Sequence, residues 1–118
     1  LRDGHHTRTV SDDVGSGERT ITLFTDYGRT RITNDNIVTN MVGTDTFRIR
    51  ERDPLSAVAQ TEWVSGVASG DADIEVTATT RLSSDAENLF LEWRAVTRER
   101  GQVVHEVGDT KTIRRDYL

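Results

Sequence analysis

Residues 74–82 read Ile-Glu-Val-Thr-Ala-Thr-Thr-Arg-Leu, and this stretch decides the fold class. The first set of alternate positions is apolar and comprises Ile74, Val76, Ala78 and Leu82. The second set is polar and comprises Glu75, Thr77, Thr79 and Arg81. Because side chains alternate between the two faces of a strand, this pattern predicts an antiparallel strand with one buried side and one solvated side.

The pattern repeats towards the C-terminus. Its next apolar row consists of Leu89, Leu91, Trp93 and Ala95. Residues 83–88 are small or polar and predict a turn, and Glu99–Gln102 predicts a hairpin loop in which Gly101 adopts the left-handed conformation. A last strand over 103–113 completes a three-stranded meander.

The N-terminal half is also rich in strand patterns. Its alternating segments lie near 19–27, 30–32, 37–42, 44–50 and 57–64, while 26–29 predicts a turn and 65–70 a glycine-punctuated loop. Val, Ile and Thr supply 35 of the 118 residues, and these side chains favour strands over helices. No segment shows helical periodicity, so the sequence predicts an all-β chain.

Composition limits the classes of protein. With 118 residues the chain forms one domain, 1–118, whose polar residues 1–17 are expected to be mobile. A net charge of −5 argues against nucleic acid as a partner, and no apolar run approaches the length of a membrane span. The absence of cysteine favours a cytoplasmic protein. Because the first residue is leucine and the only methionine is Met41, we expect a fragment of a longer protein.

Catalytic and metal-binding patterns are weak. The sequence lacks G-x-S-x-G, and neither His5 nor His6 nor His105 lies beside a candidate nucleophile. Asp71, Asp73 and Glu75 share alternate positions, but their spacing does not meet the requirements of an EF-hand loop. We therefore predict no catalytic residue, no cofactor and no metal in this chain.

Two groups are candidates for ligand or interface contacts. Arg48, Arg50 and Arg52 alternate along one strand and could clamp an anion, although solvent or acids such as Glu62 are the more ordinary partners of such arginines. Trp63 and Trp93 could form a platform for a sugar, although each belongs to the apolar row of its strand and core packing is favoured.

Several motifs, in order along the chain, resemble one family. They are Gly28-Arg29-Thr30-Arg31-Ile32, Thr46–Arg50 leading into Asp53-Pro54-Leu55-Ser56-Ala57, Glu62-Trp63, Gly70-Asp71, Thr80–Ala86, Glu99-Arg100-Gly101 and Ile113–Asp116. Together they are similar to the C-terminal region of X-Pro dipeptidyl-peptidase and cocaine-esterase-like α/β-hydrolases. The resemblance runs from about Gly4 to the end of the chain.

This resemblance implies an antiparallel β-sandwich that is jelly-roll-like and galactose-binding-domain-like. In that family the sandwich follows a catalytic α/β-hydrolase domain with a Ser-Asp-His triad. The chain would then be a non-catalytic accessory domain, its partner would be the catalytic domain of the same polypeptide, and the parent would hydrolyse esters, amides or X-Pro peptides. No triad residue is transferred to this sequence.

Two other functions remain open. A free-standing jelly-roll module could bind a carbohydrate or small ligand through Trp63 and Trp93. Alternatively, the chain could be a structural module that assembles through its sheet edges into a homo-oligomer.

Overall fold

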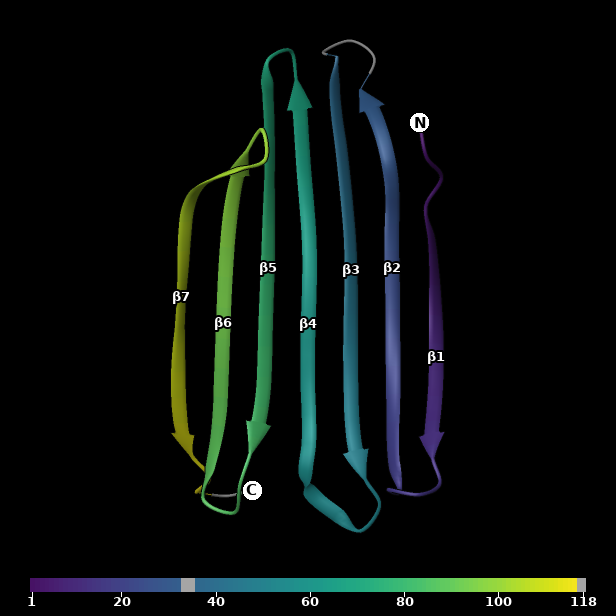
Figure 1. The fold of residues 1–118 in the computed structure, drawn as a ribbon, viewed down its shortest axis with the longest axis vertical. Coiled ribbons are helices and arrows are strands. Elements are labelled where there is room, and N and C mark those ends of the chain that lie inside the picture. Colours follow the sequence, from purple (N-terminus) through teal and green to yellow (C-terminus); the bar gives the residue numbers. More distant parts are fainter. Residues whose placement is uncertain (33–35, 117–118) are drawn as a thin grey trace.

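Seven antiparallel strands form one open sheet, and their order in the sheet is their order in the sequence (Figure 1). The computed structural model describes residues 1–32 and 36–116. The strands are β1 (His5–Asp13), β2 (Glu18–Ile32), β3 (Ile37–Arg50), β4 (Asp53–Ser69), β5 (Ala72–Ser84), β6 (Asn88–Glu99) and β7 (Gln102–Arg114). The described residues include no helix long and apolar enough to cross a membrane.

The all-β antiparallel class and the closing meander are confirmed. Strands β5, β6 and β7 follow one another as hairpins, and Gly101 has the expected positive φ of 80°. Antiparallel pairing of strands that are consecutive in the sequence continues through all seven strands, so the arrangement is simpler than that of a jelly roll. The described strands form a single curved sheet with two faces, without a second sheet stacked on it.

The strand register gives the two faces different compositions. One face, the apolar face, is represented by the cross-strand row Val10, Ile21, Phe47, Ala59, Leu82, Leu91 and Lys111. The other, the polar face, is represented by the adjacent row Thr9, Thr22, Thr46, Gln60, Arg81, Glu92 and Thr110. In these two rows the alternation of the sequence persists in register across the whole width of the sheet. Other rows are mixed, since Val42, Val64 and Val96 lie on the polar face.

The predicted turn at 26–29 is a β-bulge, and the chain does not reverse there. The β2–β3 register shifts between Asp26 and Arg29, and Gly28 has a φ of 80°. The carboxylate of Asp26, only 7% exposed, accepts hydrogen bonds from the backbone N–H of Gly28 at 2.8 Å and from Arg2 at 3.0 Å. A glycine in the left-handed conformation produces a bulge as readily as a turn, and the neighbouring strand decides between the two.

Two other segments differ from the sequence expectation. Residues 5–13, expected within a mobile terminus, form β1, which pairs with β2 along its whole length. Residues 65–69, expected as a loop, extend β4, and the chain turns only at Gly70. In both segments cross-strand pairing outweighs a weak intrinsic preference for the strand conformation.

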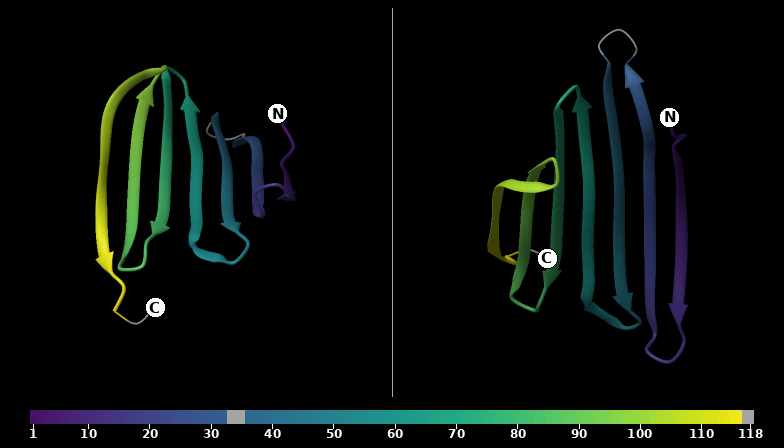
Figure 2. Two further views of the ribbon diagram at one scale, coloured as in Figure 1. Left: turned by 60° about the horizontal axis from the view of Figure 1, so that its bottom comes forward. Right: turned by 45° about the horizontal axis from the view of Figure 1, so that its top comes forward.

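The sheet twists and curls, so that β6 and β7 turn away from the plane of β3 and β4 (Figure 2). Its overall dimensions are 54 × 30 × 24 Å. Within the described ranges Val96 is the only hydrophobic residue that is buried. A sheet normally buries its apolar face against a second layer, and this chain does not provide that layer within the described residues.

Candidate functional site

The apolar face is the main candidate surface because large side chains on it remain open to solvent. The exposed members are Val10, Met41, Phe47, Ile49, Val67, Ile74, Leu82, Trp93, Val107 and Ile113. Their exposed fractions lie between 39% and 49%, whereas Val96 on the polar face is 6% exposed. The register places a more polar row, which includes Asp45, Thr61 and Thr80, among these side chains. Exposed apolar side chains gathered on one face and interrupted by polar ones are typical of a protein interface.

A hollow of about 330 Å³ interrupts the apolar face near one end of the sheet. Ala57 and Ala59, the smallest side chains lining it, lie on β4 between Phe47 and Ile49 of β3 and Leu82 of β5. Alternate alanines on one strand thus leave a depression between two higher rows. Such a depression can receive an apolar side chain of another molecule or domain.

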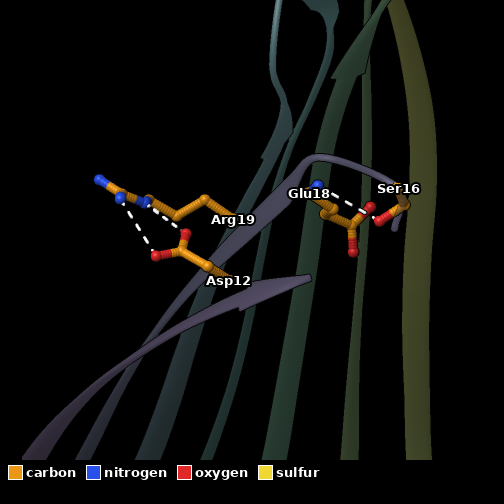
Figure 3. A network of polar contacts seen from close by, with 4 residues as sticks. All are labelled: Asp12, Ser16, Glu18 and Arg19. Atoms are coloured by element: carbon orange, nitrogen blue, oxygen red, sulfur yellow. Dashed lines mark hydrogen bonds and ion pairs between the residues drawn. The ribbon is translucent and has the colours of Figure 1, made fainter. Parts of the chain in front are cut away.

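Arg19 at the rim of this hollow is paired with Asp12 across the β1–β2 hairpin (Figure 3). Its guanidinium donates two hydrogen bonds, at 2.7 and 3.1 Å, to the Asp12 carboxylate. These hydrogen bonds lower the pKa of Asp12 and raise that of Arg19. In the same hairpin the backbone N–H of Glu18 donates to the hydroxyl of Ser16 at 3.2 Å. The positive charge of Arg19 at the rim of the hollow is therefore balanced by Asp12.

An aromatic cluster occupies another part of the apolar face. The rings of Tyr27 and Trp63 are 6.2 Å apart between centroids, with an interplanar angle of 31°. The indole N–H of Trp63 donates to the carboxylate of Asp45 at 3.1 Å. Tyr27 projects from the β-bulge and is 64% exposed.

The polar face forms a wide groove of about 980 Å³ that spans β3 to β7. Charged side chains of opposite sign alternate along it in the order Glu62, Arg81, Glu92, Arg94 and Glu106. Arg94 and Glu106 form an ion pair. This alternation is typical of a solvated sheet face stabilised by cross-strand pairs. Because Asp109 also lines the groove, its four acids exceed its two arginines and the groove is slightly negative.

The five predicted contact residues do not form one site. Arg48 and Arg50 project on the polar face, where Arg48 donates to Gln60 at 2.8 Å and Arg50 pairs with Asp53 at 2.9 Å. Neither hydrogen bonds to Glu62, which was the expected acidic neighbour. Arg52 lies in the β3–β4 turn with a φ of 61°.

Both tryptophans lie on the apolar face, as their alternation predicts, but the two are two strands apart. Trp63 is on β4 and Trp93 is on β6, and the register places Ala78 and Thr80 of β5 between them. Sequence reasoning missed Tyr27 and Asp45 as neighbours of Trp63. Gly43 was the signal that could have indicated this contact. A glycine on one strand leaves space for the ring of a tryptophan on the neighbouring strand.

The histidines lie apart from catalytic partners. The ring of His5 is tilted against that of Phe24, with 5.4 Å between their centroids, and His105 lies opposite Thr97 on the open edge of β7. No histidine in the described ranges makes a side-chain hydrogen bond to a serine or an acid, the pairing that activates a serine nucleophile. The described residues also contain no group of three or more His, Asp or Glu arranged to hold a metal ion.

No family model matches the chain, and no curated protein or solved structure is significantly similar to it.

Proposed function

We propose that the chain is a non-catalytic accessory β domain that packs through its apolar face on the catalytic α/β-hydrolase domain of the same polypeptide. The observation that carries this proposal is the set of large apolar side chains, each about 40% exposed or more, that lie on a single face of one sheet. Such a face loses unfavourable contact with water when another protein surface covers it.

The identity of the partner rests on the sequence resemblance to X-Pro dipeptidyl-peptidase and cocaine-esterase-like hydrolases. The parent enzyme would cleave esters, amides or X-Pro peptides. A cytoplasmic location is part of the same proposal and is supported by the absence of cysteine. The accessory domain would shape access to the active site or the assembly of the enzyme.

The packing claim is tested by producing this chain and the hydrolase domain encoded beside it as two separate polypeptides and measuring their co-purification. Leu82→Asp places a charge on the apolar face, and we expect it to abolish the complex. Arg81→Asp is the matched control, because its position is adjacent in sequence and on the opposite face. Loss of the complex only in the Arg81 variant, or in neither variant, would contradict the proposal.

The non-catalytic claim has a separate test. The purified chain is assayed with p-nitrophenyl acetate and with Gly-Pro-p-nitroanilide, and we expect no turnover above buffer. Turnover that follows the protein through successive purification steps and disappears in a variant of one of its own residues would overturn the claim.

A second candidate function is binding of a carbohydrate or another polar ligand, which the groove on the polar face favours. Its hydroxyl and carboxamide groups from Thr44, Thr46, Thr79 and Gln60 offer donors and acceptors along one surface. Glycan-array binding that is lost in Thr79→Val and kept in Val67→Thr would support this function.

A further inference from the structure

Tyr27, Trp63 and Asp45 come from three neighbouring strands and meet on the apolar face. We propose that this cluster binds a guanidinium group, namely an arginine side chain of the partner that covers the face. The proposal rests on the proposed function for the origin of the arginine. A single charged contact of this kind would fix the orientation of the partner on a mainly apolar surface.

The indole ring of Trp63 is held in place by the backbone of Gly43 and by the Asp45 carboxylate. A Cβ atom at Gly43 would lie 2.2 Å from both Cδ2 and Cε2 of Trp63, so the ring lies directly over the glycine backbone. The indole N–H bond to Asp45 fixes the rotation of the ring within its plane. No second layer of described residues covers the apolar face, and the half-buried Trp63 keeps part of its outward side open to a ligand.

Tyr27 forms one side of the site. The bulge that presents it is fixed by the Asp26 carboxylate, which accepts the backbone N–H of Gly28. Tyr27 is 64% exposed while its ring remains tilted against Trp63. The two rings therefore form an aromatic corner in which the indole is the fixed side, and a fixed side chain loses little entropy on binding.

Asp45 supplies the charge. Among the described residues the Asp45 carboxylate takes part in no ion pair, and its side-chain partner is the neutral indole N–H. A cation placed over the indole ring is attracted by the ring quadrupole, and here it also lies beside an anionic oxygen. A guanidinium is planar and stacks on an aromatic ring while donating to a carboxylate.

The surroundings favour a cation over a sugar. The register neighbours of Asp45 are Leu23 and Thr61, and the Thr61 hydroxyl already hydrogen bonds with Thr80. A sugar needs donors and acceptors around its whole ring, whereas this site offers mainly one carboxylate. A guanidinium carries only donors and matches a site that contains mainly an acceptor.

The test uses the full chain with Trp93→Phe, which leaves Trp63 as the sole tryptophan. Its fluorescence is titrated with N-acetyl-arginine amide and, as a neutral analogue of similar shape, N-acetyl-citrulline amide. We expect saturable binding of the arginine ligand at millimolar concentrations and at least about tenfold weaker binding of the citrulline ligand. Raising the salt concentration should weaken the arginine complex.

Substitutions locate the site. In the same background we expect Asp45→Asn to weaken binding of the arginine ligand about tenfold, and Tyr27→Ala to weaken it several-fold. Asp109→Asn is the matched control, since Asp109 is an acid on the same face in register with position 93. Circular dichroism checks the fold of each variant, and the salt dependence requires no substitution at all.

Three results would overturn the proposal: no saturable signal, equal affinity for the two ligands, or tighter binding of a glucose oligomer than of the arginine ligand. Because the isolated chain is sufficient for this test, the result is independent of whether the hydrolase domain binds. A chain that binds the hydrolase domain but not the arginine ligand would refute the cation site alone.

Discussion

The indole ring of Trp63 lies face on against the backbone of Gly43 on the neighbouring strand. Three ring atoms, Cδ2, Cε2 and Cε3, would be 2.2–2.4 Å from a Cβ atom at that position. Glycine is unfavourable within a strand, and here its missing side chain is the space that the tryptophan fills.

Gly43→Ala should therefore destabilise the protein by about 1–3 kcal/mol, because the added methyl group displaces a ring that is also hydrogen bonded to Asp45. Urea unfolding followed by tryptophan fluorescence measures the change. Gly66→Ala is the matched control, since its Cβ atom would meet the flexible side chain of Asn40. Equal losses in the two variants would contradict the account of Gly43.

Gly28→Ala should also be destabilising, for two reasons that a control can separate. The position has a φ of 80°, and a Cβ atom there would lie 2.4 Å from the backbone oxygen of Arg2. Gly101 has the same φ with no atom within 4 Å of its Cβ position, so Gly101→Ala reports the backbone strain alone, about 1–2 kcal/mol. We expect the larger loss for Gly28→Ala, together with faster amide exchange at Arg29, whose N–H donates to Arg2.

The same change, valine to threonine, should have different effects on the two faces. Val96→Thr introduces a hydroxyl at a residue that is 6% exposed, and we expect a loss of about 1–2 kcal/mol in the free energy of unfolding. Val67 is 48% exposed, so Val67→Thr should change stability by less than about 0.5 kcal/mol. Binding of an apolar dye should decrease in the Val67 variant. If Val67→Thr were as destabilising as Val96→Thr, the apolar face would be covered in solution.

Asp85 in the β5–β6 turn should make stability depend on pH. Its carboxylate accepts backbone hydrogen bonds from Glu87 at 2.8 Å and Asn88 at 2.7 Å, and these lower its pKa below the usual value of 3.8. Because the folded-state pKa is depressed, the stabilisation is present above pH 3.8 and is lost as the pH falls through the folded-state pKa.

The measurement compares wild type with Asp85→Asn by chemical unfolding at pH 7 and in the acid range. Wild type should be the more stable at pH 7, and the difference should narrow on acidification. A difference that is independent of pH would show that the ionised form of Asp85 is not preferred in the fold.

Alternation along the chain was sufficient to predict six of the seven strands, all but β1, and the side on which Trp63 and Trp93 lie. It failed where pairing between strands decides the conformation. The bulge at Gly28 and the extension of β4 beyond Ser65 both depend on the neighbouring strands, and no local pattern encodes them.

The candidate site could be predicted only in part for the same reason. Asp45 lies far from Trp63 in sequence, and their contact depends on a β3–β4 register that no motif specifies. The arginines of 48–52 illustrate the opposite case. Their shared face was predictable for Arg48 and Arg50, but the partners Gln60 and Asp53 became apparent only from the side-chain geometry.

The sequential order of the strands has a consequence for how the molecule opens. Every contact between described strands joins neighbours in sequence, so the sheet resembles a one-dimensional array in which each unit is stabilised only by the units beside it. Loss of β1 or β7 removes one interface, whereas loss of β4 removes two. Unfolding should then progress inward from the two edges, and native-state amide exchange should show the slowest exchange in the middle of the sheet.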